Sequence, residues 1–579
     1  MENQKMENLL NLALYATPDE RLRSQQLPVG FDASDRTFEV VVRYQGDPDI
    51  LSSAASEATV LLGNYAILRL PEEALDTVSS LPQITFMEKP KRLYFSAAKG
   101  RAASCINPVQ NASFSGGGLS GKGILVACID SGADYTHPDF RNPDGSSRIL
   151  RLWDQTAAAG PPPPGYHLGT LYTKEQLDAA LASGFPLEQV PSRDVSGHGT
   201  AVLGIAAGNG QASGGVLKGT APEASLAVVK LGTSDPGGFP RTTQLMQALD
   251  YIIRLSMELQ IPAAVNLSFG NSYGSHSGDS LLETYLDTVS HFGRNVICIG
   301  TGNEGDRGGH RSGKMVSGQT LDSEFRTGPY SLTTNLQVWK QYVDTADLIL
   351  IHPNGQMSPP IDPVPGPLRL RLQNTEILVY YGMPGPFSVF QEIYLDFLPV
   401  SGNSYLDGGT WTLRLIPRRI VDGTFHMWLP GGAEETSASF YLPSPDTTLT
   451  IPSTARRGIA VAAYNSALSS YAPFSGRGYT AMGEEIKPDL AAPGVDIQAP
   501  RPGGGYGVYT GTSFAAPFVT GSAALLMEWG ILRGHDPFLY GEKVKAYLRR
   551  GARQLPGYDT WPNPQLGYGV LCLRDSFPF

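Results

Sequence analysis

The strongest constraint on the fold is the alternation of short apolar runs with longer helix-like stretches between residues 119 and 309. Each apolar run is continuous and ends in small or turn residues, which is typical of strands buried on both faces of a parallel sheet. Helices must then cover both faces of that sheet. The sequence therefore predicts an α/β fold with strands at Ile124–Asp130, Ser225–Leu231, Pro262–Leu267 and Asn295–Thr301, and helices at His198–Ala207, Thr243–Glu258 and Asp279–Phe292.

The rest of the chain shows other patterns. Residues 1–96 have a β-α-β-α-β order, which predicts a small α+β domain. Residues 310–450 are rich in Thr, Tyr and turn residues, which predicts an inserted all-β domain, either a sandwich or a jelly roll. The α/β pattern of residues 97–309 returns in residues 451–579. We therefore expect these last two parts to form one domain that the all-β insert interrupts.

Composition excludes several classes of protein. The chain has 579 residues, which are too many for a single hydrophobic core. Its net charge is -10 and no basic stripe occurs, so nucleic acid is not expected as a partner. The four cysteines are few and scattered, so the sequence predicts neither a disulfide framework nor a CxxC metal site.

The sequence gives no sign of a membrane span or of a secretory signal. Its apolar runs are shorter than the ~20 residues that cross a bilayer, so no membrane partner is expected. Glu2 and Glu7 precede the apolar run Leu9–Ala16, whereas a secretory signal begins with basic residues. We expect synthesis in the cytoplasm, with export by another route if the protein is released.

Ser513 lies among small residues in the run Gly511-Thr512-Ser513-Phe514-Ala515-Ala516-Pro517, directly before a long apolar stretch. The stretch predicts a buried helix with Ser513 at its N-terminus. Free N–H groups and the positive end of the helix dipole favour a developing negative charge there. Ser513 could therefore be a nucleophile, or it could simply cap the helix.

Three polar residues could assist such a nucleophile. Asp130 ends a predicted buried strand, at the sheet edge where open α/β folds bind ligands, and its carboxylate could hold an imidazole. His198 begins a predicted helix between two glycines, which leave its ring open to a substrate. Asn303 follows another strand, and its amide could donate to an oxyanion. Taken singly, each has a plainer interpretation as a turn residue or a helix cap.

Together these residues resemble the subtilisin family of serine proteases. The order Asp, His, Ser is the subtilisin order. The local strings Asp130-Ser131-Gly132 and His198-Gly199-Thr200 match the family, as does the run around Ser513. Further matching strings are His137-Pro138-Asp139, Gly219-Thr220-Ala221-Pro222, Asn266-Leu267-Ser268-Phe269-Gly270, Gly302-Asn303-Glu304-Gly305 and Ala492-Pro493-Gly494.

The resemblance implies a role for each residue. Ser513 would attack a peptide carbonyl, His198 would act as general base and Asp130 would orient His198. Asn303 and the backbone N–H of Ser513 would bind the oxyanion. Substrate-binding residues are implied in two segments, the strand-like Ser268, Phe269 and Gly270, and the wall of the S1 pocket formed by Gly300, Thr301 and Gly302.

The layout more closely resembles the clostridial Csp proteases, which are known for spore germination. That group has an N-terminal prodomain, a subtilase core and a jelly roll inserted between the oxyanion asparagine and the catalytic serine. The segments Leu61–Pro71 and Glu88–Phe95 look like the prodomain ending of the group. The resemblance implies that residues 1–96 assist folding, are cleaved off by the enzyme itself near Ser96, Ala97 and Ala98, and stay docked in the cleft.

The implied function is a serine endopeptidase with protein or peptide substrates, among them a spore-germination precursor. Two alternatives stay open, a general or host-directed protease of a gut bacterium and a sensing pseudoprotease locked by its prodomain. Its location, spore-associated or released, also stays open. The chemistry requires no cofactor. Calcium is left open, because Asp139 matches a ligand position of many subtilisins but the loop Asn209–Lys218 lacks a clear acidic cluster.

Overall fold

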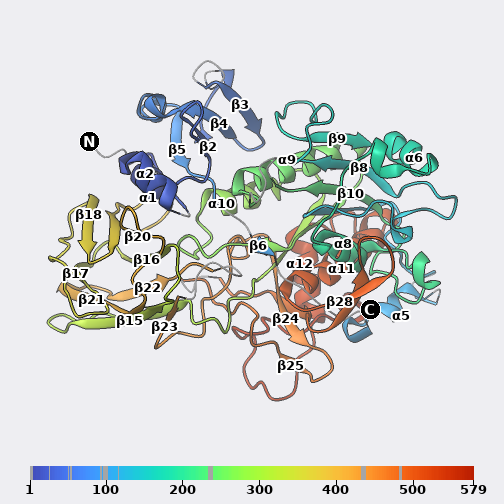
Figure 1. Cartoon of the computed structure of the whole chain (residues 1–579). Helices are drawn as coiled ribbons and strands as arrows, with labels where there is room; N and C mark the ends of the chain where they lie inside the picture. The colour runs from blue at the N-terminus through green and yellow to red at the C-terminus, as the bar shows by residue number, and fades with distance from the viewer. Residues whose placement is uncertain are drawn as a thin grey trace. The chain divides into compact units, whose positions relative to one another are not determined.

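The computed structural model describes residues 4–24, 26–49, 51, 55–91, 94–95, 102–111, 113–114, 117–232, 239–431, 438–481 and 485–578 (Figure 1). The chain forms two compact units. Unit 1 comprises Met1–Arg92, Asn271–Leu281 and Asp306–Thr448, and unit 2 comprises Leu93–Gly270, Leu282–Gly305 and Leu449–Phe579. The four domain bounds drawn from the sequence stay predictions.

Unit 2 is built on a nine-stranded sheet with the order β25-β24-β13-β11-β7-β10-β8-β9, in which β26 also pairs with β24. The pairings from β24 through to β8 are parallel, which confirms the predicted parallel sheet. All six residues of the central strand β7 are buried, because the sheet is covered on both faces. The strands are β7 (Leu125–Asp130), β8 (Ile149–Asp154), β9 (Thr170–Thr173), β10 (Ser225–Lys230), β11 (Ala263–Leu267), β13 (Asn295–Gly300), β24 (Ile459–Asn465), β25 (Ser470–Tyr471) and β26 (Leu490–Pro493).

The helices α8 (His198–Ala207) and α11 (Ala516–Met527) pack against each other and against the sheet. Every residue of both helices is buried, so neither presents a polar face to solvent. Val126 and Cys128 of β7 share one hydrophobic core with them, as the alternation of side chains along a strand requires. The remaining helices of unit 2 are α5 (Ile106–Gln110), α6 (Lys174–Ala182), α7 (Pro186–Gln189), α9 (Thr242–Leu259), α10 (Leu281–Val289), α12 (Glu542–Gly551) and α13 (Leu573–Ser576).

The helical stretch Thr512–Leu532 is longer than the apolar runs expected from the sequence. By length and composition it could cross a membrane, but 89% of its most apolar window is buried inside the protein. The core helix of a globular domain has the same character, and the stretch contributes to the core that α8 and β7 share.

Unit 1 contains the predicted α+β domain. Its sheet has the order β1-β2-β4-β3, with β5 also paired to β2, and all of its pairings are antiparallel. The sequence also predicts a helix at residues 49–57, and this range falls partly outside the described residues. The elements are α1 (Asn8–Tyr15), α2 (Pro18–Arg23), β1 (Phe31–Asp32), β2 (Thr37–Tyr44), β3 (Glu57–Leu61), β4 (Tyr65–Pro71), α4 (Leu75–Ser79) and β5 (Ile84–Glu88).

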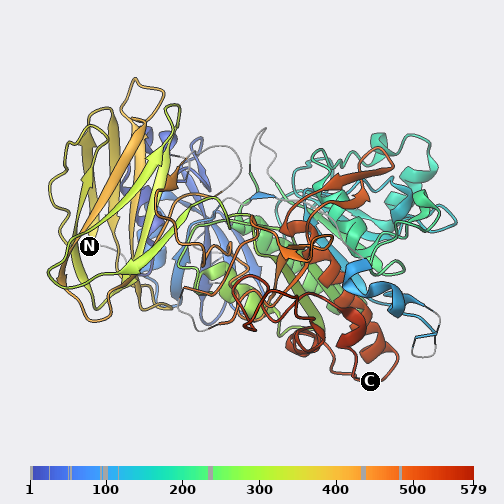
Figure 2. The same ribbon diagram turned by 90° about the horizontal axis from the view of Figure 1, so that it is seen from below.

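The insert in unit 1 has antiparallel strands in two sheets, with the orders β14-β22-β16-β20-β19-β18 and β17-β21-β15-β23. Apolar residues of both sheets form one core. Its strands run side by side in Figure 2, and the jelly-roll topology stays a prediction. The strands are β14 (His310–Lys314), β15 (Leu321–Thr327), β16 (Thr334–Gln341), β17 (Thr345–Ile351), β18 (Gly366–Leu372), β19 (Thr375–Tyr381), β20 (Phe390–Pro399), β21 (Gly409–Arg419), β22 (Thr424–Trp428) and β23 (Ser439–Phe440).

The N-terminal helices of unit 1 cover the outer face of the insert. Helix α1 contacts β19 and β20, and α2 contacts β20. All ten residues of β20 are buried, because one face looks toward the core of the insert and the other toward α1 and α2. In Figures 1 and 2 the blue helices lie beside the yellow strands.

Two details differ from the sequence predictions. The small, polar residues 96–118 predict a linker, but Ile106–Gln110 is a helix whose Ile106 and Val109 are buried. Cys105, just before it, forms a disulfide with Cys572, 467 residues along the chain. The prediction of no disulfide framework missed this pair, because the spacing of cysteines in the sequence does not show which distant cysteines the tertiary fold brings together.

Candidate active site

The imidazole of His198 contacts the carboxylate of Asp130 at the carboxyl end of the central strand. Asp130 is the last residue of β7 and His198 is the first of α8. The distance from His198 Nδ1 to Asp130 Oδ1 is 2.6 Å. The Asp130 side chain is fully buried and also accepts the backbone N–H of Ser131 at 2.7 Å. This contact fixes the direction of the ring and leaves its Nε2 on the side away from Asp130.

Asp194 holds the segment that carries His198. Its Oδ1 accepts the backbone N–H of Gly197 at 2.9 Å and the hydroxyl of Ser131 at 2.8 Å. Its Oδ2 accepts the backbone N–H and the hydroxyl of Thr200 at 2.8 and 2.7 Å. The carboxylate thus satisfies free N–H groups at the start of α8 and ties them to the loop after Asp130.

A glycine at position 199 is required by the close approach of the two loops. A Cβ added there would lie 2.1 Å from the carbonyl oxygen of Gly132, and neither backbone segment could yield easily. Cys128 lies below, with its thiol 3.9 Å from the Gly199 carbonyl, and burial raises the pKa of this thiol well above its usual range. Cys128 is therefore a neutral packing residue rather than a second nucleophile.

Ser513 is buried in a short turn, Thr512–Phe514, directly before α11. Its hydroxyl donates to the backbone carbonyl of Ser268 at 2.7 Å. The Ser268 hydroxyl in turn donates to the Ser513 carbonyl at 2.7 Å. The ring of Phe514 packs edge-on to that of His198, with centroids 5.0 Å apart. These contacts join the serine segment to the histidine helix and to the strand-like segment at 268–270.

Asn303 is fixed by the residue before the serine. Its Oδ1 accepts the backbone N–H of Thr512 at 3.1 Å and the Thr512 hydroxyl at 3.2 Å. The backbone N–H of Gly302 donates to the same hydroxyl at 3.0 Å. Because its oxygen is held in this way, the amide Nδ2 of Asn303 is the atom that can donate to a ligand beside Ser513.

The segment predicted to bind substrate already pairs with a strand. Phe269–Gly270 forms β12, which is antiparallel to β6 (Tyr94–Phe95). Phe269 lies opposite Phe95, and Gly270 lies opposite Tyr94. The chain that follows the N-terminal domain therefore pairs with the segment that the sequence predicts to bind substrate.

The structure also describes the predicted wall of the S1 pocket. Gly300 ends β13, and a Cβ there would lie 3.2 Å from the Thr512 carbonyl oxygen. Thr301 is fully buried, and its hydroxyl lies 3.4 Å from that of Ser475, so only its backbone can border a ligand. Gly302 has φ +85°, which favours glycine. The predicted cleavage region, Ser96, Ala97 and Ala98, lies outside the described residues.

Asp139 does not offer a free carboxylate for calcium. It is fully buried, its Oδ1 accepts the backbone N–H of Ala212 at 2.9 Å and its Oδ2 accepts the Tyr506 hydroxyl at 2.8 Å. Within the part of the chain that the structure describes, no group of three or more His, Cys, Asp or Glu side chains is placed to hold a metal ion. We assign no metal to these residues.

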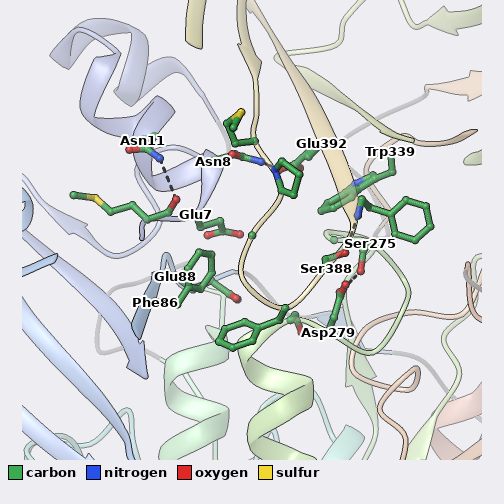
Figure 3. A pocket seen from close by; sticks show the side chains of 18 of the residues that line it. Glu7, Asn8, Asn11, Phe86, Glu88, Ser275, Asp279, Trp339, Ser388 and Glu392 are labelled. Carbon is green, nitrogen blue, oxygen red and sulfur yellow. Dashed lines mark hydrogen bonds between the residues drawn. The ribbon is translucent and has the colours of Figure 1, made fainter. Parts of the chain in front are cut away.

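Unit 1 has a cavity of a different kind, lined by carboxyl groups and aromatic rings (Figure 3). Lys91 forms ion pairs with Glu7 at 2.8 Å and with Glu88 at 2.7 Å. Glu392 of β20 accepts the amide of Asn8 in α1 at 3.0 Å. Burial raises the pKa of Glu392 to about 7. The N-terminal domain and the insert thus share a buried polar cluster.

Sequence reasoning missed Asp194 and this acidic cluster. Asp194 stands four residues before His198, outside the N-cap position that sequence rules examine, so no local signal marks it. The buried Glu392 and Asp396 alternate with apolar residues along β20, which resembles a strand with one solvated face. Nothing in the sequence says that α1 and α2 cover that face.

Comparisons with known proteins identify the family of two parts of the chain. Residues 4–91 match the family model of the Csp protease B prodomain. Residues 121–324 and 441–569 match the model of the subtilase family. The break between these two ranges falls within the all-β insert.

Individual relatives give the same picture. The solved structure of the Clostridium perfringens CspB protease is 36% identical, covers 82% of this chain and 96% of its own, and has a TM-score of 0.75. The minor extracellular protease Vpr of Bacillus subtilis (strain 168) is 23% identical over 498 residues, 79% of this chain and 52% of Vpr. Subtilisin E of the same strain is 28% identical over 246 residues, 42% of this chain and 51% of its own. The chain thus spans about half the length of these two curated relatives.

Proposed function

The chain belongs to the subtilase family, and from this premise we propose that it is a serine endopeptidase with Ser513 as its nucleophile. The observation that carries the proposal is the 2.6 Å contact between His198 and Asp130, together with the packing of the His198 ring against Phe514, the residue next to Ser513. If Ser513 and His198 were only helix caps and Asp130 only a turn residue, nothing would require them to lie at the same edge of the sheet. A nucleophile, its general base and an orienting carboxylate must lie together.

In this proposal the three residues divide the reaction among them. His198 Nε2 takes the proton of Ser513 Oγ as that oxygen attacks the peptide carbonyl, and it later gives the proton to the leaving amine. Asp130 keeps the proton on Nδ1 and stabilises the imidazolium. The Asn303 amide and the Ser513 N–H receive the oxyanion. In subtilisin, a relative of this chain, loss of one such donor costs about 2.7–4 kcal/mol of transition-state stabilisation.

The first substrate in this proposal is the chain itself. The pairing of β6 with β12 brings the chain from the N-terminal domain onto the substrate edge. Cleavage just beyond β6, in the region of Ser96 to Ala98, would leave the new C-terminus on that edge as a bound product. The N-terminal domain would then act as a prodomain that assists folding and afterwards inhibits.

The later substrates are proteins. Because the chain resembles the Csp group, we propose a spore-germination precursor as one such substrate, acted on by a spore-associated or released enzyme. The occupied substrate edge also supports a second candidate, a sensing protein whose active site stays closed by its own β6. A general or host-directed protease would need the prodomain to leave.

A fluorophosphonate probe separates these candidates. The active enzyme should be labelled in the processed wild type and not in Ser513→Ala. Asn303→Ala should keep the nucleophile but label more slowly, because the probe develops charge where the oxyanion lies. Processed wild type that stays unlabelled, while a subtilisin control reacts, would favour the closed sensor.

A further inference from the structure

Thr450 lies between the two backbone segments that flank the nucleophile. A Cβ built on Gly270 would lie 2.6 Å from Thr450 Oγ1 and 3.0 Å from Thr450 Cβ. A Cβ built on Gly302 would lie 2.3 Å from Thr450 Cγ2 and 2.5 Å from Oγ1. One threonine side chain therefore touches both glycines and fills the space between them.

The position of Thr450 is fixed by its backbone. Its N–H donates to the Thr301 carbonyl at 2.9 Å, and its carbonyl accepts the backbone N–H of Ser453 at 2.8 Å. The Ser453 hydroxyl also donates to that carbonyl, at 2.6 Å. Thr450 is 6% exposed, so the surrounding protein leaves its side chain little room to move aside.

The hydroxyl of Thr450 is buried and has no hydrogen-bond partner among the described residues. A buried hydroxyl without a partner is unfavourable, because it has lost its contact with water and gained no hydrogen bond in return. Neighbouring hydroxyls and carbonyls of the site, such as those of Ser268 and Ser453, already have partners. The natural partner for Thr450 Oγ1 is therefore a group that arrives with the substrate.

The space between the two glycines is where the side chain next to the cleaved bond must enter. On one side, Ser268 of the same segment as Gly270 accepts the Ser513 hydroxyl. On the other side, Gly302 is followed directly by Asn303. The residue whose carbonyl Ser513 attacks, called P1, presents its side chain between these two segments. On the basis of the proposed function, we infer that Thr450 closes the P1 pocket and restricts cleavage to small P1 residues, with serine preferred.

The register of β6 also indicates a small residue, serine, at the P1 position. Phe95 and Tyr94 lie opposite Phe269 and Gly270. A substrate strand in this register has its P1 residue opposite Ser268, one position after the residue opposite Phe269. Counting along the chain's own sequence, that residue is Ser96. The inference therefore assigns the self-cleaved bond to Ser96–Ala97.

Self-cleavage in the full chain provides the test, because it needs no added substrate and no release of the prodomain. Ser96→Phe should slow cleavage of the 96–97 bond at least tenfold, since one methylene too many in a pocket changes rates by about 10–200-fold. Ser96→Ala should be cleaved more slowly than wild type but faster than Ser96→Phe, because alanine fits the pocket but leaves the Thr450 hydroxyl without a partner. Lys99→Phe, with the same bulky residue outside P1, is the control and should be cleaved normally.

A second change assigns the effect to Thr450. In the Ser96→Phe chain, Thr450→Gly should restore cleavage by at least tenfold, because it reopens the pocket. Thr450→Val keeps the size but lacks the hydroxyl, so it should slow cleavage after Ser96 and have a smaller effect on the Ser96→Ala chain, which has no P1 hydroxyl to pair. Rescue of a cleaved bond also shows that the double variant folds.

The outcomes separate the two claims. If wild type is cleaved but Ser96→Phe is cut at the same bond and rate, the pocket inference is wrong and the endopeptidase stands. The same holds if Thr450→Gly gives no rescue. If wild type is neither cleaved nor labelled by the fluorophosphonate, the proposed function itself fails.

Discussion

At the scale of single residues, the candidate site consists of a few polar side chains that lie at the ends of buried strands and helices. The sequence alone predicts that Asp130, His198 and Ser513 lie at the ends of buried strands or helices. Because the carboxyl ends of parallel strands meet at one edge of a sheet, this is enough to predict that the three residues lie near each other. The sequence could not predict Asp194 or Thr450. Asp194 lies outside the N-cap position of α8, and Thr450 contacts glycines far away in the sequence, so neither has a local pattern that would mark it.

Asp194 gives a sharp prediction as a positioning residue. Asp194→Asn replaces an acceptor by an NH₂ group that faces the donating N–H of Thr200 or Gly197. We expect a loss of about 1–3 kcal/mol in the free energy of unfolding. We also expect a drop of at least tenfold in kcat with KM little changed, because the start of α8 carries His198. Chemical denaturation and steady-state kinetics on the processed protein measure the two.

Asp144→Asn is the matched control, because exposed Asp144 caps a turn by accepting the N–H and hydroxyl of Ser146 at 2.9 and 2.7 Å. It should change neither quantity. An Asp194→Asn protein that is destabilised but keeps the wild-type kcat would show that this carboxylate has a purely structural role.

At the scale of secondary-structure elements, strand β20 joins two parts of unit 1. Asp396 accepts the Ser24 hydroxyl from the segment after α2, and Glu392 accepts the Asn8 amide from α1. Burial raises the pKa of both carboxyl groups to about 7. The sequence could not predict this, because an alternating strand with two acids resembles a half-solvated strand until a second element covers it.

These raised pKa values predict that unit 1 loses stability as the pH rises. In the unfolded chain Glu392 ionises near its ordinary pKa of 4.5, whereas in the folded unit it ionises at about 7. Below 4.5 the group is neutral in both states and its contribution is fully present. Between 4.5 and 7 the unfolded state loses its proton first, so stability falls by on the order of 3 kcal/mol for this group. Urea unfolding of the Ser513→Ala protein at about pH 5 and about pH 8 measures the change.

Glu392→Gln should keep the hydrogen bond to Asn8 and remove the part of this pH dependence that Glu392 contributes, while the part due to Asp396 stays. The control is Glu324→Gln, the same exchange at an exposed position of β15. If Glu392→Gln and Glu324→Gln show the same difference between the acidic and the alkaline measurement, the buried carboxyl does not control the stability of the unit.

At the scale of the whole molecule, the sequence predicted the classes of the parts better than their assembly. Periodicity predicted the parallel sheet of unit 2, because a strand buried on both faces carries a continuous apolar signal. It could not show that the N-terminal domain and the insert, separated by most of the sheet-forming sequence, would share one compact unit. Nor could it pair Cys105 with Cys572, since spacing says nothing about a disulfide between distant segments.

The central claim is that Ser513 cleaves the chain's own segment after β6. The most direct test is the intact mass of the purified protein, wild type against Ser513→Ala. We predict that wild type separates into two polypeptides, one of which begins at Ala97, and that Ser513→Ala stays whole. If both proteins keep the same intact N-terminus, or if both are cut at the same bond, the claim is contradicted.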